Sequence, residues 1–308
     1  MKSLNIKDNN IICKVLNDGI IKNHKGVNVP NVSINLPSVT EKDKEDLIFG
    51  CKMGVDFVAA SFVRKASDVL EIRSLLNSHS GENIQIIAKI ESQEGVNNID
   101  SILEVADGIM VARGDMGVEI PIEKVPIIQK NIIKKCNAAG KIVITATQML
   151  DSMIRNSLPT RAEACDICNA IFDGTDAIML SGESASGLYP IEAAKTMSKI
   201  AKETECHLDY NYLNQRLKEP AMYDFAEAIS YSTCRTSNVL HAKAIVAATN
   251  SGSTAKLVSK YKPKCPIIAI TPNAEVMRGL SLNFGVFPVL CQEFSTTDDI
   301  LTESENNC

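Results

Sequence analysis

The 308-residue chain lacks several patterns that are typical of large classes of protein. It contains no run of about 18 apolar residues, so no membrane-spanning helix is expected. Its first residues show neither the apolar segment nor the small-residue cleavage site of a signal peptide. Its net charge of −5 argues against nucleic acid as the main partner, because such domains usually carry a basic face. We therefore expect a cytoplasmic protein that binds neither membranes nor nucleic acids.

Histidine is scarce, and cysteine shows no metal-binding pattern. None of the four histidines falls at the polar end of an expected strand, so histidine-bound metals and Ser–His catalysis are not expected. The ten cysteines are scattered, and a chain of this length needs no disulfide framework. The close pair Cys165 and Cys168 has no second pair at zinc-site spacing. We interpret it as two small residues on a helix.

Between about residues 40 and 205, apolar runs of strand length alternate with amphipathic helical patterns. This alternation is typical of a parallel sheet that is buried on both faces. Strands are expected at 55–62, 83–91, 107–115, 141–149 and 176–184. Helices are expected at 40–54, 67–80, 96–106 and 125–140.

Polar side chains gather at the carboxyl ends of these five strands, which favours a (β/α)8 barrel over a doubly wound sheet. A closed barrel needs eight strands and usually about 250 residues. The predicted fold class is therefore α/β, with a partial TIM (β/α)8 barrel of about five βα units. The polar strand-end residues are Ser61, Arg64, Lys89, Glu91, Arg113, Asp115, Thr145, Thr147, Ser181 and Glu183.

Different patterns flank the barrel segment. Residues 1–30 alternate apolar and polar and contain Asp18-Gly19, a hairpin-turn signal, so we expect the end of a small antiparallel β domain. Residues 31–205 are assigned to the partial barrel, which carries the expected site. Residues 206–308 are predicted to form a second α/β unit that stops before a complete layer is formed.

The strand that ends in IIAKIE (86–91) carries a lysine and a glutamate two positions apart. Alternate residues of a strand point to the same face, so Lys89 and Glu91 are expected to lie side by side. A buried charge is costly unless it is paired with an opposite charge or bound to a metal. Asp115 closes the next expected strand, about 4.8 Å away, so Glu91 and Asp115 are predicted to share a Mg²⁺ ion. A cation and a lysine suit developing negative charge, as in phosphoryl transfer or enolate chemistry. The alternative is a structural Lys89–Glu91 pair.

Three further segments are candidates for ligand contact. In ARGDMG (112–117), Gly114 permits close approach of the backbone, and the N–H groups that follow it suit a carboxylate or phosphate. Thr147 and Ser181 bring hydroxyl groups to later strand ends; the alternative for each is a hydroxyl satisfied by the backbone. TNSGST (249–254) opens a helix, where a phosphate is readily held, and an ordinary tight turn is its alternative.

Taken together, the motifs resemble those of pyruvate kinase, in that family's order and spacing. The resemblance covers nearly the whole chain, and GVNVP (26–30) is similar to the exit from the family's lid domain. It implies phosphoryl transfer from phosphoenolpyruvate to ADP, giving pyruvate and ATP in glycolysis, with Mg²⁺ or Mn²⁺ and normally K⁺. The motifs are AKIESQEG (88–95), MVARGDMGVEIP (110–121), TATQMLDSM (145–153), PTRAEACDICNA (159–170), DGTDAIMLSGESASGLYP (173–190) and PIIAITP (266–272).

The resemblance also implies residue roles. Lys89 matches the lysine that stabilises the transferring phosphoryl group and the enolate oxygen. Glu91 and Asp115 match the metal ligands. Gly114 and Asp115 match the backbone that holds the substrate carboxylate, and Thr147 matches a substrate-contacting threonine.

Two further implications concern proton delivery and regulation. Ser181 matches a serine near the route by which the proton is delivered. The TNSGST turn matches the loop that receives a sugar-phosphate effector in regulated members, and the family is usually a homotetramer. The effector phosphate would contact Thr249, Ser251, Gly252, Ser253 and Thr254.

The resemblance finally implies that this sequence is an interior fragment. It has no counterpart of the first three barrel strands, which carry a phosphate-binding arginine and the K⁺ ligands. Most of the lid domain and the end of the C-terminal α/β domain are likewise without a counterpart. We therefore expect the chain alone to be inactive. The alternatives are a metal-dependent pyruvate or enolate aldolase, and a non-catalytic fragment that binds a ligand or assembles with an intact subunit.

Overall fold

The chain divides into two compact units, residues 1–30 and 31–308, and each is described by itself. The structure is a computed structural model that describes residues 2–8, 10–20, 37–210 and 224–292. The motif GVNVP (26–30), assigned above to the exit of a lid domain, lies outside the described residues.

The first unit contains a two-stranded antiparallel hairpin. It is formed by β1 (Lys2–Lys7) and β2 (Asn10–Lys14), with Lys7 opposite Asn10. The chain therefore turns between these two residues. The hairpin turn predicted at Asp18-Gly19 stays a prediction, because a strand after it would fall on residues 21–36, outside the described ranges. Asp8 adopts a φ of 54° in the turn. Aspartate tolerates this left-handed conformation better than most residues, so no glycine is required there.

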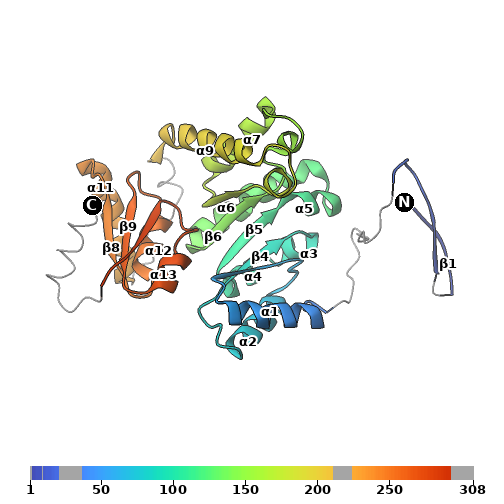
Figure 1. Ribbon diagram of the computed structural model, residues 1–308, viewed down its shortest axis with the longest axis horizontal. Helices are drawn as coiled ribbons and strands as arrows, with labels where there is room; N and C mark the ends of the chain where they lie inside the picture. Colours follow the sequence, from blue (N-terminus) through green and yellow to red (C-terminus); the bar gives the residue numbers. More distant parts are fainter. Residues whose placement is uncertain (1, 9, 21–36, 211–223, 293–308) are drawn as a thin grey trace. The chain divides into compact units, whose positions relative to one another are not determined.

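The second unit is organised around a five-stranded parallel sheet whose strands follow one another in chain order (Figure 1). Every residue of its third and fourth strands is buried, as expected for strands that are covered on both faces. The predicted α/β fold with about five βα units of a partial barrel is confirmed. The strands are β3 (Phe57–Ala60), β4 (Gln85–Ile90), β5 (Gly108–Ala112), β6 (Ile142–Ala146) and β7 (Ala177–Met179).

The helices of this part begin and end at recognisable local signals. The first turns of α1 and α7 carry capping boxes, in which Thr40 pairs with Asp43 and Thr160 with Glu163. α7 ends at Gly174, whose φ is 93° and where a Cβ would lie 2.7 Å from Nδ2 of Asn137. The helices are α1 (Glu41–Met53), α2 (Ala66–Asn77), α3 (Gln93–Asn97), α4 (Ile99–Val105), α5 (Arg113–Glu119), α6 (Val125–Ala139), α7 (Arg161–Asp173), α8 (Gly182–Ala185) and α9 (Pro190–Cys206), with 3-10 turns η1 (Ile122–Lys124) and η2 (Asp151–Ile154).

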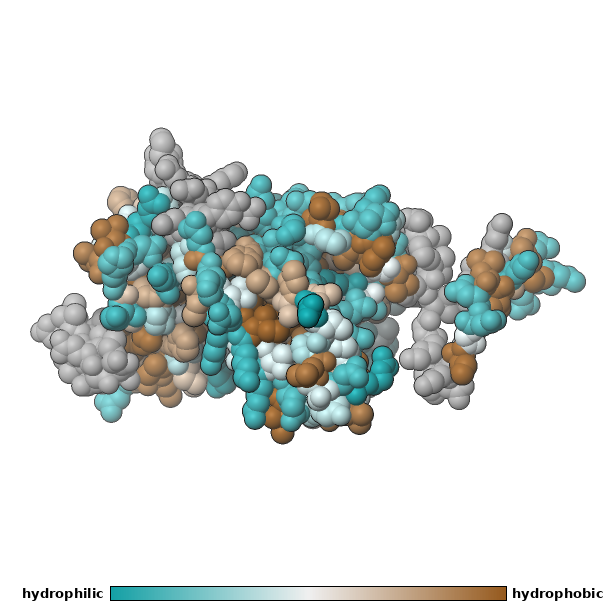
Figure 2. Space-filling view, turned by 90° about the horizontal axis from the view of Figure 1, so that it is seen from above, coloured by the Kyte–Doolittle hydropathy of each residue, from teal (hydrophilic) through white to brown (hydrophobic). Residues whose placement is uncertain are grey.

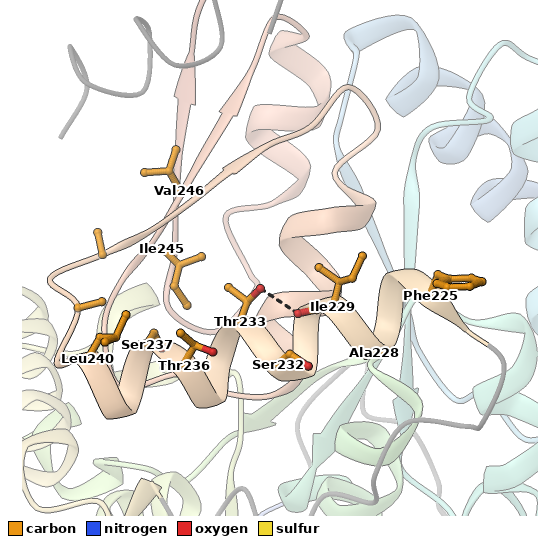
Figure 3. A pocket seen from close by; sticks show the side chains of 12 residues that line it. Phe225, Ala228, Ile229, Ser232, Thr233, Thr236, Ser237, Leu240, Ile245 and Val246 are labelled. Carbon is orange, nitrogen blue, oxygen red and sulfur yellow. Dashed lines mark hydrogen bonds between the residues drawn. The ribbon is translucent and has the colours of Figure 1, made fainter. Parts of the chain in front are cut away.

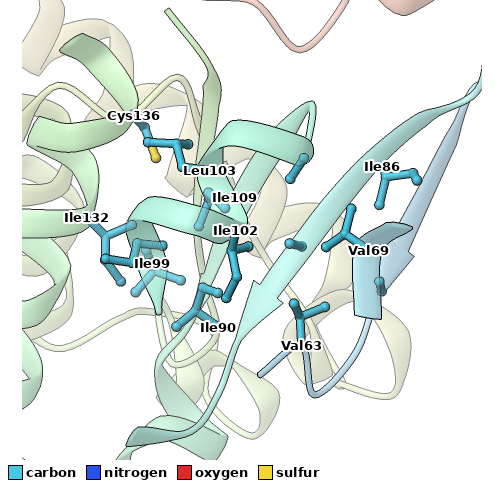
Figure 4. Close-up of a cluster of buried hydrophobic side chains, with 14 of the residues drawn as sticks. Val63, Val69, Ile86, Ile90, Ile99, Ile102, Leu103, Ile109, Ile132 and Cys136 are labelled. Carbon is cyan, nitrogen blue, oxygen red and sulfur yellow. The ribbon is translucent and has the colours of Figure 1, made fainter. Parts of the chain in front are cut away.

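A cluster of aliphatic side chains fixes the helices on the sheet (Figure 4). Ile90 and Ile109 come from β4 and β5, Ile102 from α4 and Ile132 from α6, and each is at most 2% exposed. Truncating one such side chain to alanine typically costs about 2–5 kcal/mol. A second, smaller cluster that includes Ile87 lies among residues of the same strands. The sheet is therefore held by apolar contacts from more than one side.

The remainder of the second unit is a smaller α/β layer with three parallel strands in the order β10-β9-β8. The predicted α/β character of this segment is confirmed. On α11, the ring of Tyr231 meets the ring of Tyr261 edge-on, with centroids 5.2 Å apart. The elements are α11 (Phe225–Leu240), β8 (Ile245–Ala248), α12 (Ser253–Lys260), β9 (Ile267–Thr271), α13 (Ala274–Gly279) and β10 (Val286–Leu290).

The surface of the described residues is mixed in character. Figure 2 shows hydrophilic residues over much of the visible face, with hydrophobic residues in separate patches. Phe225 and Ile229 of α11, 86% and 64% exposed, line an apolar groove of about 580 Å³ with Ile245 of β8 (Figure 3). Among the described helices, none combines the length and apolarity that a bilayer crossing needs.

A buried ion pair joins the smaller layer to the five-stranded sheet. Lys262, which follows α12, donates from Nζ to Oδ1 of Asp176 at 2.5 Å, and the side chains are only 3% and 10% exposed. The second oxygen of Asp176 accepts the N–H of Val143 at the start of β6, at 2.8 Å. The ammonium group also lies 4.4 Å from the ring centroid of Phe284. One carboxylate thus connects both layers.

Replacing Lys262 by methionine leaves the carboxylate of Asp176 buried without its cation. We expect the free energy of unfolding to fall by about 3–5 kcal/mol, because removing one partner of a buried pair leaves the other charge buried and uncompensated. Urea unfolding followed by circular dichroism measures this change. Lys44→Met is the matched control, since Lys44 forms an exposed pair with Glu41, worth less than about 1 kcal/mol. Equal losses in the two variants would contradict the prediction.

Candidate functional site

Lys89 and Glu91 lie side by side at the carboxyl end of β4. Nζ of Lys89 is 2.9 Å from Oε1 of Glu91, and it donates to Oγ of Ser61 at 2.9 Å. Ser61 directly follows β3, and β3 and β4 are paired in parallel with Ala60 opposite Ala88. The pairing of β3 with β4 therefore determines that the residues at the ends of these two strands surround the ammonium group.

The carboxylate of Glu91 is buried and only partly satisfied. Its side chain is 1% exposed, and Oε2 accepts the N–H of Phe62 at 2.6 Å. Phe62 adopts a φ of 53°, which is unusual for a bulky residue and turns its N–H toward the carboxylate. Within the described part of the chain, Oε1 has no hydrogen-bond partner, although Lys89 is its ionic neighbour. A carboxylate oxygen in this state is a suitable ligand for a hard cation.

Asp115 does not close a strand, so the predicted strand 107–115 extends too far. β5 ends at Ala112 and α5 begins at Arg113, which places Asp115 in the first turn of a helix, where a negative charge is favourable. Its side chain is exposed. In the described ranges, no group of three or more His, Cys, Asp or Glu residues could hold a metal. Mg²⁺ commonly takes only one or two protein carboxylates, so Glu91 and Asp115 remain candidates.

Thr147 connects the end of β6 to the first turn of α5. Its Oγ1 accepts the N–H of Gly114 at 2.8 Å, so this predicted substrate donor already has a protein partner. Thr147 and Gln148 have φ angles of 70° and 55°. Such angles cost about 1–3 kcal/mol each for non-glycine residues and persist only where the surroundings enforce them.

Arg113 enforces this strained turn, a role that the sequence pattern did not reveal. Its Nη2 donates to the carbonyl of Thr147 at 2.5 Å, and its Nε donates to the carbonyl of Ala146 at 3.3 Å. Its Nη1 lies 2.8 and 2.6 Å from the two oxygens of Asp166 on α7. The side chain is 9% exposed. A buried guanidinium is always charged and has five N–H donors, so it needs several acceptors nearby. An arginine at the end of a buried strand was therefore the feature of the sequence that could have indicated this role.

Glu183 is a second buried carboxylate that the sequence assigned no role. It is 1% exposed; Oε1 accepts the N–H of Leu150 at 3.0 Å and Oε2 accepts the N–H of Ser181 at 2.8 Å. Ser181 itself follows β7 and is half-buried. The carboxylate therefore ties the loop after β6 to the loop after β7, and it fixes the backbone that carries the Ser181 hydroxyl.

The TNSGST turn lies on the smaller layer, between β8 and α12, and is not part of the strand-end cluster. Oγ1 of Thr249 accepts the N–H of Gly252 at 2.9 Å, and Ser251 donates from Oγ to Oγ of Ser253 at 3.0 Å. Gly252 has a φ of 83°. The turn is thus closed by its own hydrogen bonds, whereas Ser251, Ser253 and Thr254 are exposed.

Comparison with known proteins identifies the family. Residues 1–194 match the model of the pyruvate kinase barrel domain, and residues 227–308 match the pyruvate kinase alpha/beta domain. The chain belongs to the pyruvate kinase family. The strand β4, which carries Lys89 and is directly followed by Glu91, therefore belongs to a pyruvate kinase barrel domain.

Several curated pyruvate kinases are close relatives. The chain is 69% identical over 301 residues to that of Clostridium perfringens, covering 97% of this chain and 64% of the relative. It is 61% identical to that of Clostridium acetobutylicum over 299 residues, with 97% and 63% coverage. For Bacillus licheniformis the identity is 60% over 295 residues, with 96% and 50% coverage. The chain thus spans between about half and two thirds of the length of these relatives.

Replacing Arg113 by lysine keeps the charge but removes the planar set of donors. We expect a loss of about 2–4 kcal/mol in the free energy of unfolding, because the buried contacts to Thr147 and Asp166 cannot all be kept. We also expect faster hydrogen exchange at the amide of Gly114, which bonds to Thr147. Urea unfolding and hydrogen-exchange mass spectrometry measure the two effects.

Arg155→Lys provides the matched control, because Arg155 is exposed on the same barrel part. Its free energy of unfolding should change by less than about 0.5 kcal/mol. If Arg113→Lys leaves exchange at Gly114 at the wild-type rate, Arg113 does not hold the strained turn.

Proposed function

We propose that this chain carries the metal-binding and lysine half of a pyruvate kinase site, which transfers phosphate from phosphoenolpyruvate to ADP. One observation carries the proposal: the buried Oε1 of Glu91 lacks a hydrogen-bond partner among the described residues and lies 2.9 Å from Nζ of Lys89. In a member of this family, that arrangement is better explained by a bound cation and substrate than by a structural ion pair alone.

Lys89 is proposed to act on the transferring group. Ser61 and Glu91 hold its ammonium group at the strand end, where it is 23% exposed and so accessible to a ligand. There it stabilises the negative charge that develops on the phosphoryl oxygens and on the enolate oxygen. Glu91 and Asp115 hold Mg²⁺ or Mn²⁺. When bound, this ion supplies Lewis-acid neutralisation of the phosphoryl and carboxylate oxygens.

Gly114, Asp115 and Thr147 are proposed to bind the substrate carboxylate. Because Thr147 accepts the N–H of Gly114 at Oγ1, its hydroxyl hydrogen is directed away from that bond and is available to a substrate oxygen. The N–H of Asp115 lies in the first turn of α5, among the groups that have no partner within the helix. Ser181 is proposed to lie near the route by which a proton reaches the enolate, giving pyruvate.

The remaining family properties are also proposals for this chain. The exposed Ser251, Ser253 and Thr254, with Thr249 and Gly252 shaping the turn, would receive the phosphate of a sugar-phosphate effector at the start of α12. Assembly into a homotetramer and a cytoplasmic location follow from the family in the same way. The K⁺ ligands implied by the resemblance have no counterpart in this sequence, so we propose negligible kinase activity for the chain alone, because positioning is lost.

Glu91→Gln and Asp115→Asn should each weaken Mn²⁺ binding in the presence of phosphoenolpyruvate by more than about tenfold, because each removes one anionic oxygen ligand. Isothermal titration calorimetry measures the dissociation constant. Glu123→Gln is the matched control, since Glu123 is exposed on η1 and should bind as the wild type does. Unchanged binding in both site variants would refute the proposed metal site.

Activity assays separate the reaction from the binding site. We expect no ATP formation from phosphoenolpyruvate and ADP above background by the 308-residue chain. Measurable ATP formation would contradict the proposed inactivity. Cleavage of a hydroxy-keto acid without nucleotide would instead support the aldolase alternative.

A further inference from the structure

A second cavity lies at the opposite end of the parallel strands from Lys89 and Glu91. It measures about 520 Å³ and is lined by Gln85, the first residue of β4, and by residues of the smaller layer such as Lys256 and Arg278. All of its lining residues belong to the second compact unit. This volume falls within the range of small-molecule sites, about 300–1,000 Å³. The cavity is therefore separate from the site described above.

Two of the three cationic side chains in this cavity are neutralised. Arg278 donates from Nε to both oxygens of Asp56, at 2.9 and 3.0 Å. Arg73 donates from Nη2 to Oδ2 of Asp107 at 2.6 Å and from Nη1 to the carbonyl of Ile84 at 2.8 Å. These four charges cancel in pairs, and their side chains are fixed by the contacts.

Lys256 on α12 is the cation that lacks such a partner. It is half-buried, and within the described ranges no carboxylate oxygen lies in ion-pair distance of its Nζ. Its Nζ lies 3.5 Å from Oε1 of Gln85, which is a long and weak hydrogen-bond contact. Gln85 is fixed in this orientation, since its Nε2 donates to the carbonyl of Gly279 at 2.8 Å.

Burial disfavours the charged form of this ammonium group. Desolvation lowers the pKa of Lys256; the charge of Asp107 partly offsets this shift, and the charge of Lys141 adds to it. A bound anion would oppose the desolvation and stabilise the charged form. The geometry thus leaves one half-buried positive charge facing a cavity without a protein anion of its own.

The acidic groups of the cavity do not occupy this position. Asp56 and Asp107 are committed to the arginines, and Glu275 accepts from Nδ2 of Asn83 at 3.0 Å on an exposed part of the rim. Glu82 is likewise exposed. The hydroxyl-bearing Ser251 also lines the cavity. Among the described residues that line the cavity, none of the carboxylates therefore forms an ion pair with Lys256.

We propose that this cavity binds the oxyanionic group, a phosphate or a carboxylate, of a small ligand, with Lys256 as its charged binding residue. The paired Arg73 and Arg278 keep the walls of the cavity in place. The site is distinct from the phosphoenolpyruvate site, because it lies at the amino ends of β3 and β4. It does not depend on the proposed kinase reaction.

Thermal unfolding of the 308-residue chain at constant ionic strength tests the proposal, with inorganic phosphate and acetate as probes against chloride. At a concentration about ten times its dissociation constant, the preferred anion should raise the Tm by about 2–4 °C. Lys256→Met should abolish this rise. Lys264→Met, the matched control at an exposed lysine of the same layer, should retain it. A rise with phosphate alone identifies a phosphate site, and a rise with acetate as well identifies a general oxyanion site.

Two outcomes would overturn the proposal: neither anion raises the Tm of the wild-type chain, or Lys256→Met shows the same rise as the wild type. If in the second case Thr254→Val, in the first turn of α12, abolishes the rise, the anion binds on the TNSGST turn instead.

A chemical measurement on the unmodified chain makes the test independent of variant folding. Acetic anhydride labels neutral lysine amines, and mass spectrometry compares the labelling rates of Lys256 and Lys264 with and without the anion. Bound anion should slow labelling of Lys256 several-fold and leave that of Lys264 unchanged. Equal rates at Lys256 in both conditions would contradict anion binding there.

Discussion

The parallel register of β3 to β7 is the constraint on which the candidate site depends. Each strand delivers its polar end to the same edge of the sheet, and the ladder fixes which ends are neighbours. A slip of one residue in β4 would turn Lys89 and Glu91 to the opposite face. The apolar side chains that bury both faces of the strands make such a slip costly, so packing far from the site preserves its geometry.

The charged groups at this edge are compatible with burial because the backbone and other charges compensate them. Phe62 turns its N–H to Glu91, and Arg113 holds the left-handed Thr147 through its carbonyl group. Phe62 lies two residues after the end of β3, and Thr147 directly follows β6. At both places the backbone is no longer held by the hydrogen bonds between strands. Strain of this kind is typically found at functional sites, because the surrounding fold must over-determine it. It is consistent with a site that is organised before any ligand binds.

The sequence predicted the elements better than their ends. The helix expected at 40–54 agrees closely with α1 (Glu41–Met53), because Thr40 caps its start and the left-handed Gly54 ends it. The strand 107–115 was placed too long, because α5 begins without a side-chain cap at Ala112 and so gives no local signal. The helix predicted at 96–106 is divided at Asn98, which caps two short helices and donates to the carbonyl of Arg64. The division of this helix accompanies a contact between residues 34 positions apart in the chain, which the local sequence pattern does not report.

The same reason explains which site residues were missed. Lys89 and Glu91 were predictable because strand alternation is local. The partners of Arg113 lie 33 and 53 residues further along the chain, and Gln85 and Lys256 are 171 residues apart. No periodicity within a segment reports contacts of this kind. The family resemblance identified the motif that contains Arg113 but not the strained turn that it holds.

Paramagnetic broadening by Mn²⁺ in amide nuclear magnetic resonance spectra tests whether a metal ion binds at Glu91 and Asp115, because it locates the ion without depending on a variant. Substoichiometric Mn²⁺, added with phosphoenolpyruvate, should broaden the amide signals of Phe62 and Gly114 first. The amide of Gly252 on the smaller layer should remain sharp. Broadening that begins at Gly252, or that spreads evenly over exposed carboxylates and spares Phe62, would contradict a metal site at Glu91 and Asp115.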